Sequence, residues 1–293
     1  MKRNRVRRGR AEQWLRFLAL FGRSSQRLRT ALGGPRRKQY DLVYGLDWGE
    51  TTTNNYGFAP TPLTGPERFQ LQMYDSLCEL LEKRGWAGCG RILEISCGRA
   101  GGLARLASRL RATVTVGLDF SRVSSAFCQR HYAANPGLRF VVGDAVALPF
   151  ADASFDVVVD VEATNRFGDG APLFREVARV LRNGGVFLYA DSRMMKKIPR
   201  VEAALAASGL RGELHDITEH VRRACEEDTP RRLRLLRAAV PWRYRVLLGR
   251  QIRSYLGVTG SHMYEKFRTH RREYFMACLS KDGAAGAVPS PRA

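Results

Sequence analysis

The sequence predicts an α/β fold with a doubly wound, mostly parallel sheet of seven strands and helices on both faces. Over residues 91–190, short apolar runs rich in β-branched residues alternate with stretches of helical period, which is typical of parallel strands joined by helices. Three of these runs end in or near a carboxylate, namely Glu94, Asp119 and Asp144. Because ligands of such sheets bind beyond the carboxyl ends of the strands, the three acids predict one shared ligand site.

The individual elements follow in order along the chain. A first helix begins at Pro66-Glu67 and ends before Gly85, a residue that commonly terminates helices. Strands are then predicted at 91–95, 113–118, 138–142, 155–161 and 186–190, and helices at 101–110, 122–134 and 172–182. Asn183-Gly184-Gly185 has the composition of a helix end.

The last hundred residues predict an interruption of this alternation. After Asp191 we expect a helix around 200–208, a strand near 210–215, and a last strand over 273–280. Between the last two strands lies an arginine-rich, amphipathic block over 217–256. Its place in the chain predicts a helical cap over the substrate site.

Charge and composition divide the chain into three parts. Residues 1–39 carry thirteen Lys or Arg against one acid, residues 40–192 carry fifteen against seventeen, and residues 193–293 carry twenty-one against ten. We therefore predict a basic, flexible N-terminal segment over 1–39, one globular domain over 40–281, and a disordered tail over 282–293. The six cysteines contain no C-x-x-C pair, which indicates reduced thiols in a cytoplasmic protein and no metal site.

The basic N-terminal segment predicts an anionic partner. An apolar, aromatic run over 14–21 follows six Lys or Arg, so this segment resembles a helix that lies on a membrane surface. It also resembles an organellar transit peptide, which is rich in Arg and poor in acids. A disordered tail is the third interpretation, and all three remain open. Nucleic acid is disfavoured as a partner because aromatic RNA-binding motifs are absent.

A glycine-containing loop follows the first strand and has the sequence Ser96-Cys97-Gly98-Arg99-Ala100-Gly101-Gly102. Glycine lacks a Cβ, so its backbone can turn sharply and approach a ligand closely. Ser96 stands where the G-x-G-x-x-G pattern of dinucleotide-binding folds has its first glycine. The loop alone is weak evidence, because a dinucleotide-binding fold also has glycines after its first strand and an acid after its second.

Together with Leu148-Pro149-Phe150 and Ser154-Phe155-Asp156, these motifs resemble the cofactor site of class I S-adenosylmethionine-dependent methyltransferases. The resemblance implies a Rossmann-like fold with S-adenosyl-L-methionine as cofactor. Asp119 would accept both ribose hydroxyls, Asp144 would accept from the adenine amino group, and Phe120 would offer the ring a flat apolar face. The cofactor-binding residues it implies are Glu94, Ser96, Gly98, Gly101, Asp119, Phe120, Asp144, Ala145 and Val161.

Two further motifs narrow the resemblance. Leu93-Glu94-Ile95-Ser96-Cys97-Gly98 and Asn55-Tyr56-Gly57-Phe58 are similar to segments of the phthiotriol/phenolphthiotriol dimycocerosate methyltransferases, and the second is shared with sterol methyltransferases. This resemblance implies methyl transfer to a hydroxyl of a lipid or polyketide-like molecule. Aromatic residues of the segment 40–58, among them Tyr44 and Tyr56, and His215 near the cap are the predicted substrate residues.

The predicted catalytic position departs from that group. After Glu162-Ala163-Thr164 the group places a histidine, whereas this chain has Asn165, whose amide cannot accept a proton at neutral pH. Glu162 is the nearest alternative base, and capping or binding cofactor is its other interpretation. Other acceptors remain open: nitrogen or carbon of a small molecule, RNA, or none in a non-catalytic, cofactor-binding partner subunit.

Overall fold

The computed structural model describes residues 48–62, 64–86 and 90–281. The predicted basic segment 1–39, Tyr44 and the predicted tail 282–293 lie outside these residues. Within the described part, no helix is long and apolar enough to cross a membrane.

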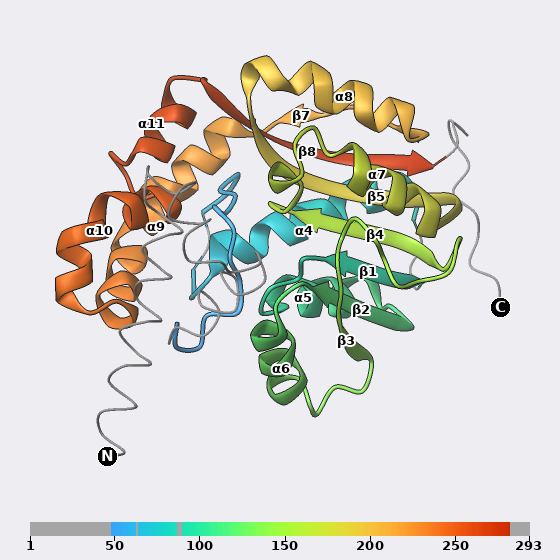
Figure 1. The fold of residues 1–293 in the computed structure, drawn as a ribbon, viewed down its shortest axis with the longest axis horizontal. Coiled ribbons are helices and arrows are strands. Elements are labelled where there is room, and N and C mark those ends of the chain that lie inside the picture. The colour runs from blue at the N-terminus through green and yellow to red at the C-terminus, as the bar shows by residue number, and fades with distance from the viewer. Residues whose placement is uncertain (1–47, 63, 87–89, 282–293) are drawn as a thin grey trace, which may run out of the picture.

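An eight-stranded sheet forms the centre of the molecule (Figure 1). Its strands are β1 (Arg91–Ile95), β2 (Val114–Asp119), β3 (Leu138–Val142), β4 (Phe155–Val161), β5 (Leu181–Met194), β6 (Leu210–Arg211), β7 (His215–Asp216) and β8 (Arg272–Lys281). The order is β3-β2-β1-β4-β5-β8-β6, with β7 paired to β8. Strands β1 to β5 are parallel, and β8 runs antiparallel to β5. The predicted α/β class and mostly parallel sheet are confirmed.

Two predicted elements need correction. The single strand expected near 210–215 is two short strands, which pair with β8 at Ser280 and Lys281 and at Phe275 and Met276 and are separated by residues 212–214. The chain passes close to β8 here, since a Cβ on Gly212 would lie 2.8 Å from the Cys278 carbonyl oxygen. This division raises the strand count from seven to eight. The helix predicted over 172–182 ends at Val180, and Leu181 already pairs with Phe155 of β4.

Helices cover both faces of the sheet, and the side chains of each strand alternate between two apolar layers. On one face, Ile92 and Val157 pack with α4 (Arg68–Glu82), α5 (Gly101–Leu110) and α6 (Arg122–His131). On the other, Leu93 and Val158 pack with α7 (Ala171–Val180) and α8 (Ile198–Ala207). The period-2 alternation of buried apolar side chains fixes the register of the strands. The short 3-10 helices η1 (Thr164–Arg166) and η2 (Met195–Lys197) follow β4 and β5.

Three helices gather at one end of the sheet, at the left of Figure 1: α9 (Thr218–Ala239), α10 (Trp242–Tyr255) and α11 (His262–Arg268). The first two form the arginine-rich block expected over 217–256. Helix α11 begins at a cap in which the Ser261 hydroxyl accepts from the Tyr264 N–H, as N-cap serines do.

Candidate active site

A cavity of about 850 Å³ opens at the carboxyl ends of the parallel strands and extends beneath the cap. It lies where the strand order reverses, because β1 pairs with β2 on one side and with β4 on the other. Ligands of open α/β sheets bind at such a point. Six of the residues predicted to bind cofactor line it: Ser96, Asp119, Phe120, Asp144, Ala145 and Val161.

The glycines of the loop position Asp119 without lining the cavity themselves. Neither Gly98 nor Gly101 is among the lining residues. The Gly98 N–H donates to Asp119 Oδ2 at 2.9 Å, and a Cβ on Gly101 would lie 2.3 Å from Thr52 Oγ1. Ser96 itself has a φ of 56°, a region that side chains with a Cβ rarely adopt. The loop therefore holds a strained turn that fixes the carboxylate of Asp119.

Two carboxylates face the cavity from the ends of β2 and β3. Asp119 is 5% exposed, and its Oδ1 accepts from the Ser121 N–H at 2.8 Å. Asp144 follows β3 and accepts from the Val146 N–H at 3.1 Å. Backbone bonds thus fix both groups, and carboxylate oxygens can accept further hydrogen bonds from a ligand.

Glu94, which was predicted to bind cofactor, is not among the residues that line the cavity. The Tyr74 hydroxyl donates to Glu94 Oε1 at 2.8 Å, while Oε2 is buried and has no hydrogen-bond partner in the described chain. Burial raises the pKa of Glu94 to about 8. A Cβ on Gly102 would overlap the Tyr74 ring, so Glu94 and Tyr74 support the start of α5 from underneath.

Glu162 occupies the carboxyl end of β4 and lines the cavity beside the predicted cofactor residues. Its backbone has a φ of 63°, and such strain is concentrated at functional sites. Its Oε1 accepts from the Tyr56 N–H at 2.6 Å and from the Tyr274 hydroxyl at 3.0 Å. Burial raises the pKa of Glu162 to about 7, against the lowering effect of the Tyr56 N–H. Glu162 thus has a proton affinity suited to exchange at neutral pH.

Asn165 also lines the cavity, in the turn of η1. Its side-chain amide donates to Asp191 Oδ1 at 2.8 Å and to the Glu162 carbonyl oxygen at 3.1 Å. Asp191 is fully buried and also forms an ion pair with Arg193 at 2.8 Å. The structure therefore places Asn165 as a donor to a buried carboxylate, a role that leaves proton acceptance to another residue.

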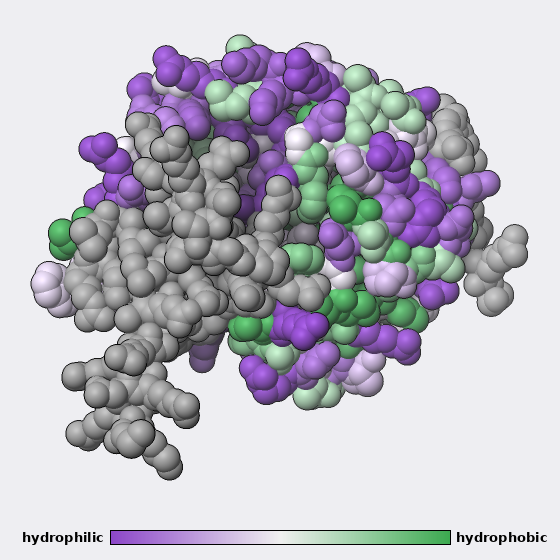
Figure 2. Space-filling view, in the orientation of Figure 1, coloured by the Kyte–Doolittle hydropathy of each residue, from purple (hydrophilic) through white to green (hydrophobic). Residues whose placement is uncertain are grey.

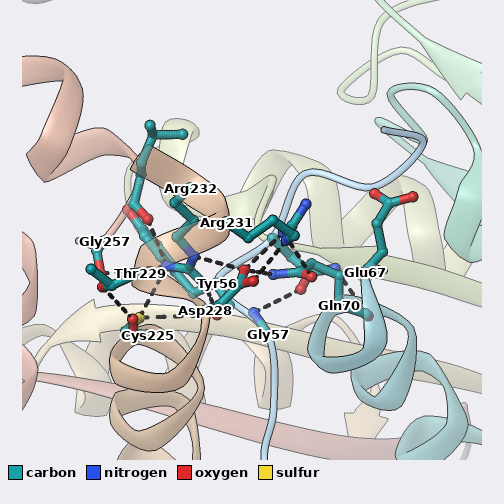
Figure 3. Close-up of polar contacts among 12 residues, drawn as sticks. Tyr56, Gly57, Glu67, Gln70, Cys225, Asp228, Thr229, Arg231, Arg232 and Gly257 are labelled. Carbon is teal, nitrogen blue, oxygen red and sulfur yellow. Dashed lines mark hydrogen bonds and ion pairs between the residues drawn. The ribbon is translucent and has the colours of Figure 1, made fainter. Parts of the chain in front are cut away.

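A buried network ties the cap to the segment before α4. Figure 3 shows the side chains of Arg231 and Arg232 converging on Asp228, which also accepts from Gln70 Nε2 at 2.9 Å. Arg232 Nη2 donates to the Tyr56 carbonyl oxygen at 2.5 Å, and the N–H of the same Tyr56 donates to Glu162. The network thus positions both Tyr56 and the adjacent acid Glu162. Tyr56 lines the cavity, and its role as a substrate residue stays a prediction.

His215 is not brought to the cavity. It lies exposed in β7, paired with Met276 of β8, and the lining histidine is His262, at the start of α11. Six arginines also line the cavity against the three acids Asp119, Asp144 and Glu162: Arg99, Arg166, Arg231, Arg232, Arg250 and Arg272. No spacing motif marks these residues, and only the arginine-rich composition of the cap hinted at them.

Comparison with known proteins agrees with this geometry. Residues 93–189 match the family described as "Methyltransferase domain". The probable phthiotriol/phenolphthiotriol dimycocerosates methyltransferase 2 of Mycobacterium ulcerans is 38% identical over 67% of this chain and 73% of its own. The fatty-acid O-methyltransferase of Mycolicibacterium smegmatis is 35% identical over 84% of this chain and 86% of its own.

A solved structure shares the fold. Geranyl diphosphate C-methyltransferase from Streptomyces coelicolor, in complex with S-adenosyl-L-homocysteine, superposes with a TM-score of 0.59 at 16% identity, over 83% of this chain and 98% of its own. The fold and site thus define a class I S-adenosylmethionine-dependent methyltransferase. Within that class, the chain belongs to the family that includes the phthiotriol/phenolphthiotriol dimycocerosates methyltransferases.

The cofactor end of the cavity fits S-adenosyl-L-methionine, the cofactor of this class. Asp119 and Asp144 offer two fixed carboxylates to the hydroxyl and amino donors of an adenosyl group, and half-buried Phe120 adds an aromatic face. When bound, the cofactor supplies an electrophilic methyl group carried on a sulfonium. The assignment of individual residues to its parts remains a prediction.

Asp119→Ala is expected to weaken S-adenosyl-L-methionine binding by about 1.5–3 kcal/mol, the usual contribution of hydrogen bonds to a charged group. The substitution also removes the acceptor that holds the Gly98 N–H, so folding must be checked by circular dichroism. Calorimetric titration of mutant and wild type measures the effect, and equal affinities in a folded mutant would refute the site.

Proposed function

We propose that the protein transfers a methyl group to a hydroxyl oxygen of a hydrophobic molecule of lipid or polyketide type, with Glu162 as the base. The observation that carries this proposal is the position of Glu162, a half-buried acid on the wall of the cavity whose pKa is raised to about 7. An alcohol must lose its proton during methyl transfer, and Asn165 cannot accept it.

The surroundings of Glu162 support this role. The Tyr56 N–H and the Tyr274 hydroxyl both donate to Oε1 of Glu162. No described residue donates a hydrogen bond to Oε2. That oxygen would receive the hydroxyl proton while the first oxygen keeps the carboxylate in place. Tyr56 and the cap would hold the acceptor and exclude water, and such positioning contributes up to roughly 7–11 kcal/mol in favourable reactions.

A second candidate is methylation of a carboxylate. The six arginines against three acids give the cavity wall a positive balance, which favours an anionic acceptor. A carboxylate is already ionised at neutral pH and needs no base. Such an acceptor is therefore compatible with Asn165, which cannot accept a proton. One relative at 35% identity is a fatty-acid O-methyltransferase.

Turnover of a matched pair of acceptors tests both candidates. A long-chain alcohol and the fatty acid of equal length are incubated with labelled S-adenosyl-L-methionine, and products are identified by mass spectrometry beside those from a lipid extract. An alkali-stable methyl ether supports the hydroxyl proposal, whereas an alkali-labile methyl ester supports the carboxylate. Label only on nitrogen, carbon or RNA would refute both.

We also propose that the basic segment 1–39 gives a cytoplasmic enzyme a peripheral contact with anionic membrane. Its support is the excess of thirteen Lys or Arg over the single acid Glu12, since each basic residue near such a surface contributes about 1 kcal/mol. Deletion of residues 1–38 is expected to weaken co-sedimentation with anionic vesicles at unchanged cofactor affinity. Undiminished co-sedimentation would contradict a membrane role for the segment. An organellar location follows instead if cells cleave the segment as a transit peptide.

A further inference from the structure

Helix α10 presents an apolar pair to the outside of the cap. Trp242 and Val246 are 69% and 76% exposed, and they are the two most exposed large hydrophobic side chains in the part of the chain that the structure describes. They stand four residues apart, so they share one face of the helix. In Figure 2 hydrophobic atoms emerge at the left edge of the molecule, over the position of α10.

Arginines continue the same face. Arg250 and Arg253 are exposed, and at eight and eleven residues after Trp242 they project on its side of the helix. The opposite side is fixed in the protein, where Ile252 is fully buried. Between Asp228 and Glu265 the sequence has eight arginines and no acid. A tryptophan and an aliphatic side chain flanked by unopposed arginines are typical of a helix that lies in a membrane interface.

The same helix forms part of the cavity wall. Gln251, Ser254 and Tyr255 line the cavity, and exposed Arg250 lies at its edge as well as on the outer face. Whatever covers the outer face of α10 therefore sits next to an opening of the cavity.

We propose that the outer face of α10 docks onto an anionic lipid surface. Trp242 and Val246 enter the interface, and Arg250 and Arg253 contact anionic headgroups. This inference rests on the proposed function in one respect, because it explains how a hydrophobic acceptor reaches the cavity without crossing water. It is distinct from the contact proposed for residues 1–39, since it involves a folded part of the cap.

Three other partners for the outer face of α10 fit less well: a second copy of the chain, the segment 1–39, and a nucleic acid. A second copy in a two-fold dimer would place the arginines of one α10 near those of the other. The segment 1–39 is itself basic, so it would be repelled by the same arginines. A nucleic acid would satisfy the arginines but would leave Val246 without an apolar partner.

Vesicle flotation with the full chain tests the proposal. Vesicles of phosphatidylcholine with phosphatidylglycerol are compared with phosphatidylcholine alone, for wild type, Trp242→Ala/Val246→Ser and Arg253→Gln. The control is Met195→Ser, which removes an exposed hydrophobic side chain outside the cap. We expect binding to weaken by more than about tenfold in the double variant, because apolar burial is lost. About fivefold is expected for Arg253→Gln, the equivalent of about 1 kcal/mol.

A second readout reports on α10 itself. In a Trp14→Phe background, which removes the tryptophan of the basic segment 1–39, anionic vesicles are expected to shift tryptophan emission to the blue, and most of this shift should disappear when Trp242→Phe is added. Methyl transfer to a short, water-soluble acceptor should be unchanged in Trp242→Ala/Val246→Ser, which separates failure of docking from failure of the proposed chemistry. Binding that depends only on residues 1–38, dimerisation lost with the double variant, or displacement by RNA but not by lipid would each overturn the proposal.

Discussion

Glu162→Gln is expected to lower turnover on a hydroxyl acceptor by about 10²–10⁴-fold, the usual contribution of a general base. Glutamine keeps an oxygen that can accept from the Tyr56 N–H and the Tyr274 hydroxyl, so the segment before α4 should stay in place. Only the ability to take a proton is removed. Steady-state kinetics with a long-chain alcohol measures the loss, and calorimetry must show unchanged cofactor affinity.

The pH dependence of the wild type provides an independent check. The base acts only as a carboxylate, and burial raises the pKa of Glu162 to about 7. Below that pH the ionised fraction falls tenfold per unit, so kcat/KM should rise with pH up to about 7 and then level off. Glu162→Gln should lack this rise. A flat wild-type profile between pH 5 and 8, or full activity of the mutant, would exclude Glu162 as the base.

Asn165→His in the Glu162→Gln background is the matching rescue. The amide of Asn165 donates to Asp191 at 2.8 Å, and one ring nitrogen of a histidine can take over this donation and leave the other to accept a proton. Turnover should return in part, above a pH of roughly 6.5. The triple variant Glu162→Gln/Asn165→His/Asp191→Asn is the control. If turnover also returns in that variant, Asp191 does not orient the histidine and the proposed orientation is wrong.

Arg232→Met is expected to destabilise the protein by about 3–5 kcal/mol, as breaking a buried ion pair usually does. Asp228 is 2% exposed and would lose one of its two arginines. The carbonyl oxygens of Tyr56 and Leu256 would lose their donor as well. Because this network reaches Tyr56, which in turn contacts Glu162, the variant should also lose turnover.

Urea unfolding measures this effect against a matched control. Arg234→Met makes the same exchange at an exposed position of α9 and should change stability by no more than about 0.5 kcal/mol. Arg232→Lys retains the charge, so it should fold even if Arg232→Met does not, with a smaller loss. Equal midpoints for the variants at 232 and 234 would show that the buried network does not hold the cap.

Local pattern alone determined much of this molecule. The strands at 91–95, 138–142 and 155–161 and the helix at 101–110 have the bounds that the sequence predicts. For the central strands at 91–95 and 155–161, burial on both faces of the sheet favours nearly continuous apolar runs. The sequence pattern also predicted that Asp119 and Asp144 converge on one cavity. Parallel strands present their carboxyl ends at one edge, so the position of an acid along each strand is enough to bring it there.

Other features depended on contacts between distant segments. The two short strands β6 and β7 both pair with β8, about sixty residues later in the chain, and no local signal encodes that pairing. His262 rather than His215 reaches the cavity because α11 packs over the end of the sheet while β7 pairs at its edge. The arginines of the wall come from elements far apart in sequence, so their shared charge could not be read from spacing.

The roles of Glu162 and Asn165 show the same division. The sequence placed both after β4 and identified the missing histidine. Only the tertiary structure surrounds Glu162 with Tyr56 and Tyr274, and Asn165 with Asp191. Burial beneath these distant segments raises the pKa of Glu162, while the hydrogen bonds from Tyr56 and Tyr274 lower it. A residue's place at a strand end is thus local information, whereas its proton affinity is a property of everything packed around it.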